Sequence, residues 1–312
     1  MTGREPAGPA PFPMDQDSFF MKRKVVDIHP HIISPDIVRY PRAPLFGKPS
    51  AWSLERPASL ERLIAEMDVA GVAKAAIVHA STCYGYDNRY VADAVAQYPR
   101  RFTGVFSVDM QAADAPARIR YWAGRKLTGL RLFTAGSTIE GQAPGLGDPA
   151  SFPAWDCAAE LGLPVCVQMR MAGIAQLRGL LARYPRLPIV IDHFLAMPQG
   201  DGPPYDSARE LFALAGHDNV HLKLTPAVVA RARQGGADPE SFFRLAFSAF
   251  GAQRVAWGSN FPASAGSLAQ ILADSEAALA WARSEELDWV FHRTAGQLYP
   301  ALRDDYDRKE LA

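Results

Sequence analysis

"VVDIHPHII", residues 25–33, joins a run of β-favouring residues to two histidines that are spaced one residue apart. Side chains two positions apart in an extended chain point to the same side, so His29 and His31 are expected to lie together. Two such imidazoles can chelate a divalent metal, or they can bind and polarise a carbonyl oxygen. The competing interpretation is a structural pair that hydrogen-bonds to neighbouring carboxylates.

Seven further β-favouring runs follow this first one, and stretches with helical spacing of apolar residues lie between them. The predicted strands cover residues 25–29, 75–79, 102–108, 128–132, 164–168, 188–193, 220–224 and 254–258. The predicted helices cover residues 59–71, 88–99, 151–162, 172–185, 206–216, 239–251 and 267–282. This alternation predicts an α/β fold, a single (β/α)8 TIM barrel with its site at the carboxyl ends of the strands. An open doubly wound sheet would carry a glycine-rich phosphate turn after the first strand, and "DIHPHIISPD" has none.

Composition excludes several classes of partner. The 312 residues are 48% hydrophobic, which is enough for a full core, and they carry a net charge of zero. Nucleic acid and anionic membranes select a basic face, so neither is an expected partner. No run approaches the roughly 18 apolar residues of a membrane span. The three cysteines suggest reduced thiols and a cytoplasmic location, and a homo-oligomer is left open.

Polar residues gather at the ends of the predicted strands, where a barrel carries its active site. Several histidines at one barrel mouth indicate function, because buried imidazoles without partners cost stability. The polar set comprises Asp27, His29, His31, His79, Asp109, Arg131, Gln168, Asp192, His193, Lys223 and Asn260.

Five motifs in order resemble those of the amidohydrolase superfamily, in the branch called amidohydrolase 2. They are "DIHPHII", "GLRLF", "VIDHF", "VHLKLT" and "WGSNFP", and the resemblance runs from about Val25 to Leu302. The branch includes lactonases, 2-pyrone-4,6-dicarboxylate hydrolase and several decarboxylases. "FHRTAGQLYP" resembles its closing helix, so residues 23–312 are predicted to form one barrel domain with a C-terminal helix. Residues 1–22 are predicted to form a flexible arm, because the basic cluster of "DSFFMKRKV" follows the apolar patch, the wrong order for a signal peptide.

Two positions depart from the metal-dependent pattern of the branch. Its metal-binding members carry a histidine after strand five and an aspartate after strand eight, where this chain has Gln168 and Asn260. A neutral amide is a poor zinc ligand, so the sequence predicts no bound metal and no other cofactor. Zinc at His29 and His31 is the alternative that this reasoning leaves open.

The pyrone-dicarboxylate hydrolases imply how a metal-free site is arranged. In them, histidines and a strand-four arginine polarise the lactone carbonyl, and the strand-eight aspartate activates water. The resemblance therefore implies catalytic roles for His29, His31 and His193, but Asn260 cannot accept a proton at neutral pH. His193 is the hypothesised base, and Asn260 is expected to orient the nucleophile.

Arg131 and Lys223 are the candidate cations for substrate binding. The fork of Arg131 suits a carboxylate or a lactone carbonyl, and the alternative is an ion pair with Asp109 or Asp27. Lys223 is expected to pair with a charge rather than to form a Schiff base.

Gln168 and Tyr84 complete the predicted substrate-binding set. Tyr84 belongs to the loop at residues 81–90, which is expected to lie over the barrel mouth. The long segments at 133–152 and 197–205 are predicted to shape the pocket.

These observations favour a metal-independent hydrolase that acts on a small carboxylated lactone or a related cyclic ester. The expected partner is thus a small anionic molecule. A decarboxylase of an aromatic or unsaturated acid is the first alternative, and it would call for a metal. A barrel that binds a ligand without catalysis is the second.

Overall fold

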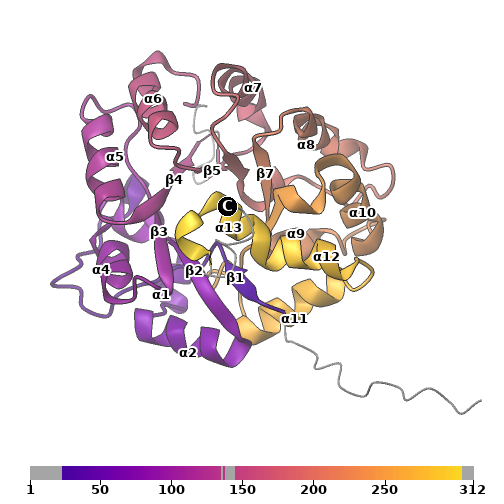
Figure 1. Ribbon diagram of the computed structural model, residues 1–312, viewed down its shortest axis with the longest axis horizontal. Coiled ribbons are helices and arrows are strands. Elements are labelled where there is room, and N and C mark those ends of the chain that lie inside the picture. Colours follow the sequence, from indigo (N-terminus) through magenta and orange to yellow (C-terminus); the bar gives the residue numbers. More distant parts are fainter. Residues whose placement is uncertain (1–22, 135, 138–144, 304–312) are drawn as a thin grey trace, which may run out of the picture.

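The computed structural model describes residues 23–134, 136–137 and 145–303. Eight parallel strands follow one another around a single sheet in chain order, each paired with the next, and the helices lie outside them (Figure 1). The predicted (β/α)8 barrel is therefore confirmed, while the predicted arm at residues 1–22 lies outside the described residues. The strands are β1 (Val25–Asp27), β2 (Val72–Val78), β3 (Phe102–Phe106), β4 (Leu127–Phe133), β5 (Val165–Gln168), β6 (Ile189–Ile191), β7 (Val220–Leu224) and β8 (Val255–Trp257).

Each predicted strand is present, and five end one or two residues earlier than expected, β1 and β6 among them. The strands read as continuous apolar runs because helices cover their outer faces and side chains fill the barrel. β1 ends at Asp27, so His29 and His31 lie just beyond it, and β6 ends at Ile191, before a left-handed turn. In both cases the regular ladder stops where the functional side chains begin.

The helices surround the barrel with one irregular sector. Ser59 caps α2 by accepting from the Arg62 amide, and Gly71 ends it with a φ of 75°. The predicted helix at 206–216 is instead three short pieces around α8, and α1, α3, α5, α9 and α12 were not predicted. The helices are α1 (Ala51–Glu55), α2 (Leu60–Ala70), α3 (Ser81–Tyr84), α4 (Arg89–Gln97), α5 (Ala115–Gly124), α6 (Phe152–Glu160), α7 (Ile174–Arg183), α8 (Arg209–Phe212), α9 (Pro226–Arg231), α10 (Pro239–Phe250), α11 (Leu268–Ala278), α12 (Ser284–Asp288) and α13 (Thr294–Leu298).

Contacts between β8 and β1 bring the first and last motifs of the chain together. The Ile28 amide donates to the Trp257 carbonyl at 3.2 Å, and the Ser259 amide donates to the Asp27 carboxylate at 2.9 Å. Gly258 permits this approach, because a Cβ there would lie only 2.5 Å from the Cβ of His29. "DIHPHII" and "WGSNFP" thus form one side of the barrel mouth.

The helix α13 closes the opposite end of the barrel, where it lies near the centre of the view in Figure 1. Tyr299, just after α13, enters the interior, and a Cβ on Gly129 would lie 2.8 Å from its ring. The barrel is therefore a packed core rather than a pore. Within the described part of the chain, no helix is long and apolar enough to span a membrane.

Candidate active site

His31 presents a proton-accepting nitrogen to the barrel mouth. Its Nδ1 lies 2.8 Å from the Val78 carbonyl oxygen, which can only accept, so Nδ1 carries the hydrogen and Nε2 keeps its lone pair. Trp52 stacks on the ring with centroids 5.2 Å apart. Burial and the nearby Arg131 lower the pKa of His31 to about 3. The imidazole is therefore neutral at physiological pH.

His193 sits in an unusual left-handed turn. The four residues His193–Ala196 have φ values of 53°, 52°, 58° and 51°, although none is glycine. Such residues cost about 1–2 kcal/mol each, so surrounding contacts must hold the turn. Phe194 packs against Phe242 and Phe243, and Arg231 Nη2 donates to the His193 carbonyl at 2.7 Å.

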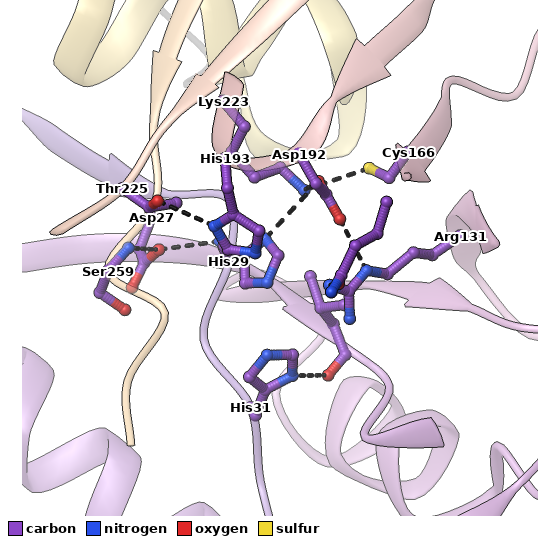
Figure 2. A network of polar contacts seen from close by, with 12 residues as sticks. Asp27, His29, His31, Arg131, Cys166, Asp192, His193, Lys223, Thr225 and Ser259 are labelled. Atoms are coloured by element: carbon purple, nitrogen blue, oxygen red, sulfur yellow. Dashed lines mark hydrogen bonds and ion pairs between the residues drawn. The ribbon is translucent and has the colours of Figure 1, made fainter. Parts of the chain in front are cut away.

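The ring of His193 is oriented by Thr225. Its Nδ1 lies 2.8 Å from Thr225 Oγ1, and Thr225 is fully buried (Figure 2). The threonine hydroxyl has no other acceptor among the described residues, so its hydrogen is satisfied only if it donates to Nδ1. That assignment places the hydrogen of the neutral His193 ring on Nε2. Burial lowers the pKa of His193 to about 3 despite the raising effect of Asp192.

Asp192 is the charge centre beneath the mouth. Arg131 Nε donates to one carboxylate oxygen at 2.7 Å, and Lys223 Nζ lies 2.6 Å from the other (Figure 2). Burial alone would raise the pKa of Asp192, but Lys223 and Arg131 hold it well below its usual range. Lys223 therefore has the expected charge-pairing role. For Arg131, the alternative of an ion pair with an inward acid is met, but by Asp192 after β6 and not by the suggested Asp109 or Asp27.

Lys223 is not on the surface of the mouth. Its side chain is fully buried, and Nζ also donates to Cys166 Sγ at 3.2 Å. Cys166 Sγ lies 3.4 Å from the Tyr299 hydroxyl, so a polar chain runs down the barrel from Asp192. Burial raises the pKa of the Cys166 thiol. This chain supports the site from below and gives Lys223 no access to a ligand in the cavity above.

His29 lies under the other two histidines, with ring centroids 4.9 Å from His31 and 5.0 Å from His193. Its backbone amide donates to Asp27 Oδ1 at 2.9 Å, and burial raises the pKa of Asp27 to about 6. Neither ring nitrogen of His29 has a hydrogen-bond partner among the residues that the structure describes. Burial and the charge of Lys223 lower its pKa well below the usual range.

A cavity of about 340 Å³ opens above these residues. Arg131 Nη2 donates to Gln168 Oε1 at its edge. Asn260, with a φ of 52°, donates from Nδ2 to Ser264 Oγ at 3.1 Å. The structure thus joins five predicted site residues in one cavity wall, together with Trp52: His31, Arg131, Gln168, His193 and Asn260.

Three predicted site residues do not line this cavity: His29 and Lys223 are buried beneath it, and Tyr84 lies to one side. The Tyr84 side chain is 3% exposed and packs with Ile33, Tyr40 and Cys83, while its hydroxyl accepts from the Ser34 amide at 2.8 Å. Sequence reasoning assigned no role to Trp52 or Thr225. The sequence around Trp52 gives no signal for it, whereas Thr225 closes the motif "VHLKLT".

The side chains that surround His29 include the described residues nearest to a metal-binding arrangement. His29, Asp192 and His193 each place one ligand atom within 4.8 Å of the others. However, both carboxylate oxygens of Asp192 are already paired with resident cations, Lys223 and Arg131. A divalent ion would meet both positive charges at short range and gain little from a neutralised carboxylate. The cluster as built does not fit such an ion.

Known proteins resemble this chain in sequence and in fold. The family model described as Amidohydrolase (Amidohydro_2) matches residues 26–301. An L-fucono-1,5-lactonase of Burkholderia ambifaria is 31% identical over 231 residues, which are 72% of this chain and 75% of that protein. A solved structure of a probable 2-pyrone-4,6-dicarboxylic acid hydrolase of Acinetobacter baumannii, with citric acid bound, has a TM-score of 0.71 at 16% identity and covers 89% of this chain and 99% of its own.

A solved 5-carboxyvanillate decarboxylase of Sphingomonas paucimobilis has a TM-score of 0.59 at 17% identity, with 89% of this chain and 99% of that chain covered. At such identities the two solved structures show a common fold alone. The family model spans nearly all of the barrel, from β1 to the residues after α13. The chain therefore belongs to the amidohydrolase family.

Proposed function

We propose that this amidohydrolase opens the ring ester of a small lactone by hydrolysis, without a bound metal ion. The observation that carries the proposal is the pairing, in one cavity, of an imidazole that accepts a proton, His31, with one that donates, His193. The relative named L-fucono-1,5-lactonase supports a lactone as the substrate.

His31 has the role of general base in this proposal. Water attacks the lactone carbonyl while Nε2 of His31 takes a proton, and the Val78 carbonyl stabilises the imidazolium through Nδ1. The ring oxygen then leaves as the tetrahedral intermediate collapses, and it takes the proton back from His31. The low pKa makes His31 a weak base, and the negative charge that develops on the substrate raises its basicity. The product is a hydroxy acid.

The carbonyl oxygen needs donors where its negative charge develops. His193 Nε2 supplies one in the tautomer that Thr225 selects. Arg131 supplies the second from Nη1, which makes no hydrogen bond to the other described residues, whereas Nε and Nη2 are held by Asp192 and Gln168. Asn260 orients the attacking water beside them. The sequence suggested His193 as the base, and the contact with Thr225 favours His31 instead.

The charges around Asp192 support the metal-independent reaction proposed here. Lys223 and Arg131 flank Asp192 and leave the cluster with a net positive charge before any ion binds. At the cavity, Arg131 and His193 supply the electrostatic stabilisation that a Lewis acid supplies in other hydrolases. The decarboxylase alternative called for a metal, so the same cluster disfavours it.

The expectation of a carboxylated substrate rested on two cations at the mouth. The structure leaves one of these two cations at the mouth: Lys223 is fully buried, whereas Arg131 lines the cavity. Two of the guanidinium nitrogens are committed to protein partners. The cavity therefore accepts a substrate with at most one carboxylate.

The assay measures proton release from a panel of lactones by native protein and two variants. His31→Gln removes the proton acceptor and should lower turnover by roughly 10²-fold or more. His79→Gln is the matched control: His79 is equally buried near the mouth but donates to the Gly85 carbonyl and does not line the cavity. Its turnover should stay within a few-fold of native. Equal losses in the two variants, or none in His31→Gln, would refute the assignment.

A further inference from the structure

A second cavity adjoins the first across a shared wall. It has a volume of about 300 Å³ and lies over the ends of β3 and β4. Arg131 and Phe133 line both cavities, and the Arg131 guanidinium lies 4.4 Å from the centre of the Phe133 ring. A substrate held at Arg131 therefore has room to extend past Phe133 in this direction.

The second cavity is lined by hydrogen-bonding groups and aromatic faces. Asp109 follows β3, and its Oδ1 accepts from the Gln111 amide at 3.0 Å. This contact orients the exposed carboxylate, and Oδ2 has no partner among the described residues. Tyr86 lies on the same wall, and burial together with Asp109 raises its pKa to about 12, which keeps its phenol a donor. Phe46 and Phe133 supply flat apolar surfaces.

The charges of this cavity indicate what it accepts. Among the described residues that line it, Arg131 and Asp109 are the charged ones, and Arg131 already faces Asp192. An anionic group would meet Asp109, and the one cation among the described lining residues, Arg131, is already paired with Asp192. A hydroxyl group can donate to the carboxylate and accept from the phenol, and aromatic rings suit the apolar face of a polyol.

We propose that the second cavity is a subsite for an uncharged, hydroxyl-bearing substituent of the substrate, and that Asp109 selects it over a carboxylate. The subsite rests on the proposed lactone hydrolysis, because it binds the arm of the molecule whose ring ester is opened beside His31. Asp109 touches the substituent and not the reacting atoms, so it determines specificity and takes no part in the chemistry.

The test compares two lactones of the same ring, one with a hydroxylated side arm and one whose arm ends in a carboxylate. The ratio of kcat/KM for the neutral lactone to kcat/KM for the carboxylated lactone is measured in native protein, Asp109→Asn and Asp109→Lys at low salt. The native ratio should be about tenfold in favour of the neutral lactone. It should fall close to one in Asp109→Asn and invert in Asp109→Lys.

Asp114→Asn is the matched control, since Asp114 is an exposed acid just before α5 that pairs with Arg118 and lines neither cavity. Its ratio should equal the native ratio. An unchanged ratio in both Asp109 variants, with lactone turnover intact, overturns the subsite and leaves the proposed function standing. An equal shift in Asp114→Asn overturns the assignment to Asp109. Preference for an amine-bearing arm overturns the ligand class, and no turnover of any lactone overturns both proposals.

Discussion

Asn260 occupies the position at which the resemblance implies an aspartate. The left-handed φ of 52° is one that asparagine and aspartate tolerate better than other non-glycine residues, so the backbone permits either side chain. Nδ2 of Asn260 is held by Ser264. Its amide oxygen accepts no hydrogen bond from the other described residues. An amide placed in this way can accept from a water molecule but cannot remove a proton from it.

Substitution of Asn260 tests whether its amide orients the attacking water or only packs against its neighbours. Asn260→Ala should lower kcat by about 10²-fold, the scale of one positioned polar group, with little change in KM. Ser264→Ala is the control for the hydrogen bond that holds the amide, and it should cost less. A native kcat in Asn260→Ala would show that the amide only packs.

Asn260→Asp tests the electrostatics of His31. A carboxylate in the cavity wall favours the protonated imidazole, so it should raise the pKa of His31 from about 3. In the native protein kcat/KM should be flat between pH 5 and 8. In Asn260→Asp it should rise with pH across the lower part of that range. Identical pH profiles would contradict the placement of these two side chains in one wall.

At the scale of elements, the strands were predictable and the turn after β6 was not. Buried parallel strands leave a clear apolar pattern, and all eight appear near their predicted positions. Four consecutive left-handed residues leave no sequence signal, because no glycine marks them. Helix α5 was missed because only Ala115 and Ile119 are buried, which gives a weak apolar stripe. His31, Arg131 and Gln168 were predicted to line the cavity because they lie at or near strand ends. Trp52 lies in helix α1, so the same reasoning missed it.

Arg231 is expected to position His193 through the turn that carries it. Its donation to the His193 carbonyl holds a backbone conformation that costs energy. Arg231→Met should lower kcat about tenfold or more with little change in KM, and Arg231→Lys should recover part of the loss. In a His193→Ala background, Arg231→Met should cost no further kcat while its effect on the free energy of unfolding stays the same. A full additional loss of kcat in that background would assign Arg231 a purely structural role.

For the whole molecule, the buried histidines make stability depend on pH. Burial, the leading cause in each, lowers the pKa of His31 and His193 to about 3 and of His79 and His221 to about 4. Since unfolded imidazoles titrate near 6.5, the unfolded chain binds more protons below that pH, and the free energy of unfolding falls as pH falls. Asp27, with its pKa raised to about 6, acts in the opposite direction but is a single group.

Urea titrations at pH 7.5 and 5.5 test whether the free energy of unfolding falls as pH falls. The free energy of unfolding should fall by about 1 kcal/mol for each such imidazole, and His79→Gln should show a smaller fall than the native protein. Stability that is constant or higher at pH 5.5 would contradict the burial of neutral histidines in the barrel.

The central claim is that two resident cations, and no metal, organise a lactone-opening site around Asp192. The most direct test determines the metal content of protein purified without chelators, then compares kcat/KM for the lactone panel before and after exhaustive chelation. The account predicts lactone turnover that is unchanged within about twofold, with metal far below one ion per chain. Near-equimolar zinc or manganese that leaves together with activity, and restores it when added back, would contradict the account.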